Sequence, residues 1–189
     1  MTEKRLLLTC FEPFGGREHN ASRDALAALP DAVGGYTLHK LCLPVVFGAA
    51  AERALAAASA LRPDAIVCVG EAAGRAAITP ELVAINLQYA RIPDNLGNAP
   101  MDAPCVAGGE NALFATLPVR RMARAVCDAG LPGEVSYSAG AYVCNDLFYR
   151  VLHRYRDAAV RCGFIHVPAG DAWRAEDLAA GLAACIRAL

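Results

Sequence analysis

The chain has 189 residues, of which 56% are hydrophobic and 20% are charged, with 18 Lys and Arg against 19 Asp and Glu. This apolar content can offset the entropy cost of folding, so the composition excludes a disordered chain, and the length favours a single domain over residues 1–189. The balanced charge provides no electrostatic basis for binding nucleic acid or an anionic membrane surface.

Membrane insertion and secretion are not expected either. The longest stretches without a charged residue, residues 41–51 and 135–145, are about half as long as the ~20 residues that a membrane-spanning helix needs. The N-terminal apolar run at residues 6–11 ends at Glu12 and is too short for a secretory signal. We therefore expect a soluble, cytoplasmic protein.

In chain order, the hydrophobic pattern predicts alternating strands and helices. Strands are expected at residues 5–10, 36–43, 65–69, 82–87, 134–138 and 163–167, and helices at residues 22–29, 46–61, 119–129, 143–155 and 178–189. Ser22 is the expected cap of the first helix. The Pro- and Gly-rich residues 88–109 predict a long irregular segment, which is often functional. The alternation predicts an α/β sandwich with a mostly parallel sheet.

Eight cysteines are spread along the chain. A disulfide framework is typical of small secreted proteins, and this chain does not have that character. No CxxC motif occurs and no two histidines lie four residues apart, so we expect no metal site and no cofactor. Most of the thiols are expected to be buried as small apolar side chains.

Cys144 differs from the other cysteines in its predicted position. It follows a turn at Gly140 and lies in the first turn of a helix, near unpaired backbone N–H groups and the positive end of the helix dipole. Such surroundings stabilise a thiolate and lower the pKa of the thiol, which makes Cys144 a candidate nucleophile. A structural cysteine under the helix is the alternative.

His166 and Glu81 are candidate partners of this thiol. His166 ends an apolar strand, and a Cys–His pair is a recurring arrangement for acyl transfer. Glu81 begins another apolar stretch and could orient the imidazole. A hydrogen-bonded structural histidine and a surface glutamate are the alternatives. Arg120, Arg121 and Arg124 are expected to form a solvated outer helix face.

Five sequence blocks carry a family resemblance. They are FEPFGG at residues 11–16 with Asn20, TPELVAIN at 79–86, ARIPDN at 90–95 with GN at 97–98, GAYVCN at 140–145 and GFIHVP at 163–168. In this order they resemble the signature blocks of pyroglutamyl peptidase type I (pyrrolidone-carboxylate peptidase). The resemblance implies a cysteine peptidase with a triad of Glu81, Cys144 and His166. It further implies release of an N-terminal L-pyroglutamyl residue through a thioester, a three-layer phosphorylase/hydrolase-like fold, and often a homotetramer.

The pyroglutamyl ring is small, flat and uncharged, so its site needs apolar walls and a few placed polar groups. By resemblance, the expected substrate-binding residues are Phe11, Phe14, Asn20, Glu71, Arg91, Ile92, Tyr142 and Val143. Phe11 and Phe14 could instead be core residues.

The chain departs from the family pattern at three positions. Cys10 stands where many members have Gly, Tyr142 where bacterial members often have Phe, and Glu71 where many bacterial members have Gln. A carboxylate at residue 71 would disfavour a thiolate, so Glu71 either points away and uses mainly its backbone toward the ligand, or it shifts the pH optimum.

Two other functions stay open at this point. Residues 70–74 could form the phosphate loop of a nucleoside phosphorylase, although no motif with an established phosphate-binding mechanism is present. A binding protein that keeps the pocket without catalysis is the second alternative, because of the departures at Cys10 and Glu71.

Overall fold

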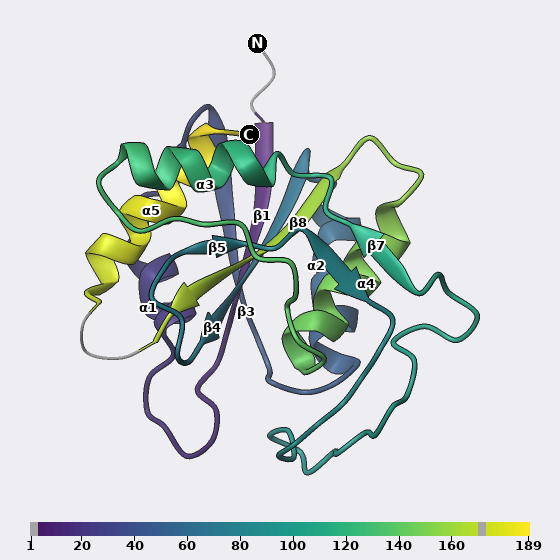
Figure 1. Cartoon of the computed structure of the whole chain (residues 1–189). Helices are drawn as coiled ribbons and strands as arrows, with labels where there is room; N and C mark the ends of the chain where they lie inside the picture. Colours follow the sequence, from purple (N-terminus) through teal and green to yellow (C-terminus); the bar gives the residue numbers. More distant parts are fainter. Residues whose placement is uncertain (1–3, 170–172) are drawn as a thin grey trace.

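The computed structural model describes residues 4–169 and 173–189. Its main sheet contains six strands in the order β2-β3-β1-β4-β8-β5 (Figure 1). These strands are β1 (Lys4–Phe11), β2 (Ala32–Val33), β3 (Tyr36–Leu43), β4 (Ala65–Ala72), β5 (Thr79–Pro80) and β8 (Arg161–Pro168). The four long strands pair in parallel, whereas β2 and β5 pair antiparallel to β3 and β8 at the two edges.

Helices cover both faces of this sheet (Figure 1). One layer contains α1 (Ala21–Ala28), α3 (Val119–Asp128) and α5 (Ala175–Arg187), and the other contains α2 (Ala49–Leu61) and α4 (Val143–Tyr155). Alternate residues of β1 serve the two layers, since Leu6 and Leu8 pack in one core and Leu7 in the other. Burial on both faces explains why the central strands are continuous apolar runs. The expected three-layer α/β sandwich is confirmed.

Two helices begin at other residues than the sequence predicts. Asn20 rather than Ser22 caps α1, because Ser22 N–H donates to Asn20 Oδ1 at 3.0 Å. The Ser22 hydroxyl instead accepts the backbone N–H of Phe11 at 3.1 Å, which ties the helix to the end of β1. Helix α2 begins at Ala49 and not at residue 46, because Gly48 has a left-handed φ of 73° that interrupts the helical backbone.

The predicted strand at residues 134–138 is wrong. Ser136 forms only an isolated bridge with Glu81, and Gly133 forms another with Ile78, so no continuous ladder is built there. The predicted strand at residues 82–87 is shorter than expected. It is β6 (Val83–Ile85), which pairs antiparallel with β7 (Ala112–Phe114) in a separate two-stranded sheet.

The segment between β6 and β7 is irregular, as predicted, and side chains hold it in place. Asp94 accepts the backbone N–H groups of Phe47, Leu96 and Asn98 at 2.9–3.0 Å. The buried carboxylate of Asp146 on α4 accepts the Gln88 side-chain amide at 2.7 Å. These bonds satisfy polar groups of a segment whose backbone has no strand ladder to pair it.

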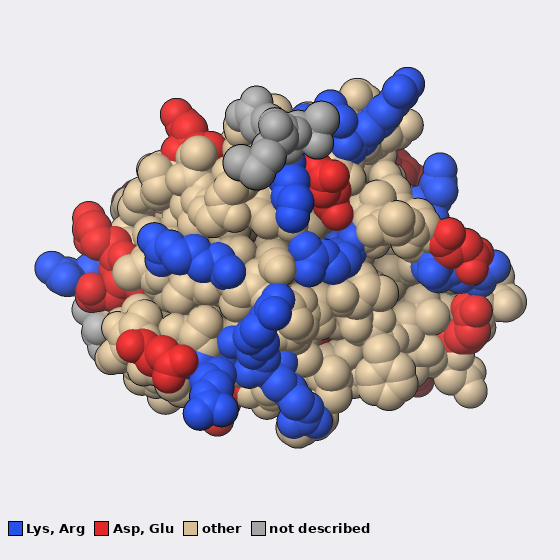
Figure 2. Space-filling view, turned by 90° about the horizontal axis from the view of Figure 1, so that it is seen from above, with Lys and Arg blue, Asp and Glu red and all other residues tan. Residues whose placement is uncertain are grey.

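The outer face of α3 is basic, as the sequence predicts. Arg120, Arg121 and Arg124 are exposed, and Lys and Arg side chains gather on this face when the molecule is seen from above (Figure 2). Arg121 also donates to the carbonyl oxygens of Ala188 and Leu189, which stabilises the end of α5. None of the helices in the described part of the chain has the length and apolar character needed to cross a bilayer.

Candidate active site

A pocket of about 760 Å³ opens at the carboxyl ends of the parallel strands, where ligands of such sheets usually bind. Four segments that are far apart in the sequence contribute most of its lining: residues 11–20, 71–73, 89–92 and 140–144. The half-buried thiol of Cys144 lies on its wall.

The start of α4 is anchored so that Cys144 has a defined position. Gly140 has a φ of 76°, a left-handed conformation that permits the turn before the helix. Asn145, which is fully buried, donates from its amide to the carbonyl oxygens of Ile85 and Leu87, each at 2.9 Å, and accepts the Ile85 N–H at 3.0 Å. The residue after Cys144 therefore fastens the first helical turn to β6 and the chain that follows it.

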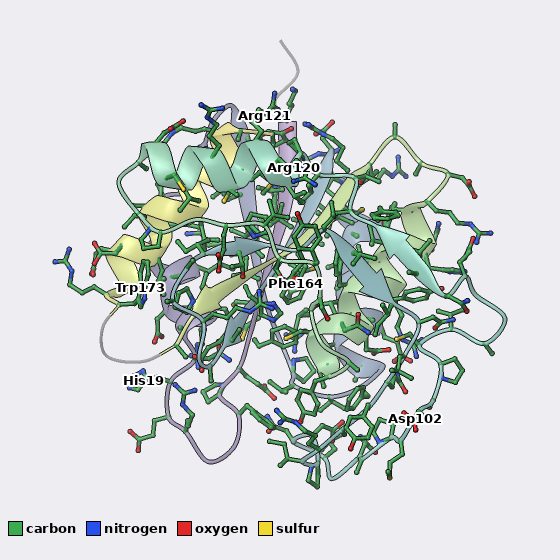
Figure 3. All side chains as sticks on the ribbon, in the orientation of Figure 1. His19, Asp102, Arg120, Arg121, Phe164 and Trp173 are labelled. Atoms are coloured by element: carbon green, nitrogen blue, oxygen red, sulfur yellow. The ribbon has the colours of Figure 1, made fainter. Side chains whose placement is uncertain are left out.

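Gly70 brings the sulfur and the imidazole to the same face of the sheet. A Cβ built on Gly70 would lie 3.0 Å from Cys144 Sγ, so the sulfur rests directly on this position of β4. His166 is the register partner of Gly70 on β8, and partners in adjacent strands direct their side chains to the same face. The aromatic ring of Phe164, near the centre of the molecule in Figure 3, lies 4.7 Å from the His166 ring between centroids.

His166 and Glu81 form a buried pair. The distance between His166 Nδ1 and Glu81 Oε1 is 2.6 Å, and the two residues are 4% and 0% exposed. The backbone N–H of Glu81 donates to the Phe164 carbonyl at 2.9 Å, which sets the position of the carboxylate along β8. Because an ionised carboxylate only accepts hydrogen bonds, Nδ1 carries the proton and Nε2 presents a lone pair.

Arg75 is a part of the site that the sequence analysis missed. Its guanidinium donates to Glu81 Oε1 at 2.7 Å, to the Ser138 carbonyl at 3.0 Å and to the Thr79 hydroxyl. The sequence signal was a lone cation just after Gly74, between the apolar strand β4 and Glu81. Arg75 joins the carboxylate to the segment that leads into Cys144.

Burial and these contacts set the charges of the pair. Burial lowers the pKa of His166, Glu81 opposes this, and Arg75 lowers it further, so the net pKa is below its ordinary value and the ring is neutral. Burial raises the pKa of Glu81, but the hydrogen bonds of His166 and Ser136 and the charge of Arg75 outweigh it, and the net pKa is lowered. The resting pair is therefore a carboxylate and a neutral imidazole.

The expectation of an ionised thiol is wrong for the resting site. Burial raises the pKa of Cys144 to about 12; the neighbouring Glu81 and Cys68 raise it as well, and Arg75 opposes them. Burial therefore outweighs the stabilisation that the start of the helix provides, and the resting sulfur is protonated. A nearby base is needed to remove this proton.

Most of the predicted substrate-binding residues line the pocket; they are Phe11, Phe14, Asn20, Glu71, Arg91, Ile92 and Tyr142. Val143 does not, because its side chain is 1% exposed and packs in the core under α4. Phe11 is 2% exposed and is both a core residue and the pocket floor. The Phe14 and Tyr142 rings are 5.5 Å apart between centroids and form one aromatic wall. His19, on the loop after β1 (Figure 3), also lines the pocket.

Asn20 and Glu71 have structural contacts in addition to their place in the pocket. The Asn20 side chain caps α1 and donates to the Glu12 carbonyl at 3.1 Å. Glu71 does not point away from the pocket. Its carboxylate is bound by the guanidinium of Arg17 and by the backbone N–H of Ala21.

A family model described as pyroglutamyl peptidase matches residues 4–184 of the chain. The chain belongs to this family. It is 46% identical over 166 residues to the pyrrolidone-carboxylate peptidase of Levilactobacillus brevis, which covers 87% of this chain and 81% of that protein. It is 47% identical over 166 residues to the one of Gloeobacter violaceus, with the same two shares.

Solved structures of the family agree with the fold. The pyroglutamyl peptidase I of Bacillus amyloliquefaciens superposes with a TM-score of 0.93 at 36% identity, over 98% of this chain and 96% of that one. The pyrrolidone carboxyl peptidase of Thermus thermophilus gives 0.91 at 37% identity, over 97% and 100%. The resemblance found in the sequence is thus confirmed, and the chain is a cysteine-type peptidase rather than a phosphorylase or a binding protein without catalysis.

Proposed function

We propose that the chain hydrolyses the bond after an N-terminal L-pyroglutamyl residue and releases pyroglutamate. In this proposal Cys144 is the nucleophile, His166 the proton shuttle and Glu81 the group that orients the imidazole. One observation carries the assignment: a buried, neutral imidazole, oriented by a carboxylate at 2.6 Å, shares a sheet face with the pocket sulfur.

Acylation begins from the neutral pair of Cys144 and His166. As Sγ attacks the pyroglutamyl carbonyl carbon, its proton passes to His166 Nε2, and the carboxylate of Glu81 stabilises the imidazolium that forms. Backbone N–H groups at the start of α4 donate to the oxyanion of the tetrahedral intermediate. The intermediate collapses to a thioester when His166 gives the proton to the leaving amine.

Deacylation uses the same groups in reverse roles. His166 accepts a proton from water as the water oxygen attacks the thioester carbonyl carbon, and the second tetrahedral intermediate releases pyroglutamate. The proton on His166 then returns to Cys144 Sγ. The carboxylate of Glu81 keeps the same tautomer of the ring in both halves of the reaction.

The pocket is suited to an uncharged lactam ring. Phe14, Tyr142 and Ile92 provide apolar walls, and the carboxylate of Glu71 is already paired. An N-terminal ammonium would therefore lose its hydration without gaining a free carboxylate, which is costly. Arg91, exposed at the pocket, contributes positive charge beside the substrate.

We also propose a homo-oligomer, a tetramer by family resemblance, in the cytoplasm. Large apolar side chains are exposed on the irregular segment, with Leu96 at 76% and Met101 at 71%, and association of copies would cover them. Light scattering after size-exclusion chromatography tests the assembly, and a monomer at micromolar concentration would contradict it.

Hydrolysis of a pyroglutamyl-coumarin amide tests the proposed function. We expect Cys144→Ser to reduce kcat on the order of 10⁴-fold or more. Cys127→Ser is the matched control, because Cys127 is an exposed thiol on α3 outside the pocket, and it should keep wild-type rates. Equal rates for wild type and Cys144→Ser would refute the nucleophile. Comparable turnover of prolyl and glutaminyl analogues would refute the lactam pocket.

A further inference from the structure

The carboxylate of Glu71 uses both of its oxygens within the pocket. Oε1 accepts from the Arg17 guanidinium, and Oε2 accepts the backbone N–H of Ala21 at 2.6 Å. The Glu71 side chain is only 9% exposed, whereas that of Arg17 is 50% exposed. One buried carboxylate at the end of β4 therefore holds two points of the loop that runs from β1 to α1.

The part of this loop before Arg17 has little packing of its own. Gly15 and Gly16 have φ values of 66° and 75°, and a Cβ built on either would meet no atom within 4 Å. The Arg17 N–H closes the turn by donating to the Phe14 carbonyl at 3.4 Å. On its other side, the loop is held where the Asn95 amide donates to the Pro13 carbonyl at 3.1 Å.

The loop carries one wall of the pocket. Phe14 lies in it, and its ring packs against Tyr142, which is two residues before Cys144. The Tyr142 ring is supported on another side by Phe47 at 5.2 Å between centroids, and its hydroxyl donates to the Pro93 carbonyl at 3.0 Å. Tyr142 is therefore fixed from elsewhere, and the position of Phe14 depends on how its own loop is fastened.

The same contacts balance charge in the pocket. An unpaired carboxylate at residue 71 would leave a negative charge on the wall of a pocket that an uncharged ring must fill. The guanidinium of Arg17 and the N-terminus of α1 both compensate this charge. Arg17 and the Ala21 N–H thus neutralise and hold the Glu71 carboxylate within the pocket.

We propose that Arg17 and Glu71 form a latch that holds the Phe14 loop in its substrate-binding position and neutralises the Glu71 carboxylate in the pocket. Both are positioning residues that act through Phe14 and through charge balance. This inference rests on the proposed function, because it assigns the latch to the pyroglutamyl pocket.

Steady-state kinetics with the pyroglutamyl-coumarin amide tests the latch. Arg17→Met leaves Glu71 with one partner, and we expect kcat/KM to fall about 5-fold, mainly through KM. The effect is modest because the Arg17 side chain is 50% exposed and solvent screens its charge. Arg17→Lys should retain most of the activity. The double variant Arg17→Met with Glu71→Gln should recover only part of the loss, because the unpaired charge is gone and the amide oxygen introduced at residue 71 still accepts the Ala21 N–H, whereas the loop still lacks its Arg17 contact.

Salt and a neighbouring charge provide the controls. High salt should raise the KM of the wild type toward that of Arg17→Met and leave the double variant unchanged, because salt screens an exposed ion pair. Glu18→Gln removes an exposed charge from the same loop, without a partner among the described residues, and should behave as wild type. Arg17→Met indistinguishable from wild type, or a wild-type KM that does not change with salt, would overturn the latch.

Hydrogen exchange separates the latch from the proposed function. In the Cys144→Ser background, amides of residues 14–20 should exchange faster when Arg17 is replaced by Met. If the Arg17→Met change speeds exchange but the wild-type protein does not hydrolyse pyroglutamyl substrates, the latch is supported and the proposed function is refuted. Unchanged exchange and unchanged KM in an active enzyme would refute the latch alone.

Discussion

Replacing Gly70 by Ala places a methyl group between the nucleophile and its aromatic neighbour. The added Cβ would lie 3.0 Å from Cys144 Sγ and 2.8 Å from Cζ of Phe164. Non-bonded heavy atoms prefer separations of about 3.5–4.0 Å. The sulfur and the ring must therefore each move by roughly half an ångström or more.

Two effects of different size follow from this displacement. A misplacement of about 1 Å at a reacting atom can cost about 100-fold in rate, so we expect Gly70→Ala to lower kcat by about 10-fold or more. Overpacking of a filled core costs about 1–3 kcal/mol, and each kcal/mol lowers Tm by about 2–4 °C in a chain of this length. The variant should fold and bind substrate but react slowly.

Gly163→Ala is the matched control. Its Cβ would lie 2.4 Å from Cδ1 of Leu117, so it also overpacks the sheet, but its clash is with a side chain outside the pocket. Calorimetry should show a lower Tm for both variants, while kinetics with the coumarin substrate should show reduced kcat for Gly70→Ala only. Wild-type kcat in Gly70→Ala, or an equal loss of kcat in both, would refute the placement of the sulfur against β4.

Two further changes test charge and anchoring. Arg75 lowers the pKa of His166, so Arg75→Gln should raise that pKa. His166 would then be protonated at higher pH, and the acid limb of the kcat/KM profile should move to higher pH. An acid limb at the same pH as in the wild type would contradict the assignment. Asp146 is fully buried and accepts hydrogen bonds from Gln88 and Arg150. Asp146→Asn should therefore lower the free energy of unfolding, measured by urea denaturation, by about 1–3 kcal/mol. A free energy of unfolding equal to that of the wild type would contradict the anchoring role of Asp146.

Long elements could be predicted from the sequence because their signals are local. The strand at residues 36–43 and the helix at 143–155 have the predicted bounds, since apolar periodicity and Gly140 are visible in the chain itself. The two-residue strands β2 and β5 were missed, and the strand predicted at residues 134–138 does not form. Whether such short segments pair depends on which strand edge lies beside them, and this is a tertiary property.

The pocket shows a similar division. Sequence blocks pointed to Cys144 and to most of the lining. Val143 was also assigned to the pocket by resemblance, but adjacent residues on a helix face different directions, and Val143 is buried in the core. Arg17 was not found as the partner of Glu71, because 54 residues separate the two in the sequence. Arg75 was not found as the partner of Glu81 either, because no single helix or strand contains both residues. The ionisation of the thiol was predicted from the helix start and the neighbouring imidazole, whereas burial, which raises the pKa of Cys144, depends on the folded chain.

The pocket has no counterpart in any fragment of the chain, because its walls come from segments that only the completed sheet brings together. A compound that occupies it must therefore reinforce the native state as a whole. Recognition and global stability are thus thermodynamically coupled: a tight inhibitor that binds only the folded chain would raise the free energy of unfolding of destabilised variants.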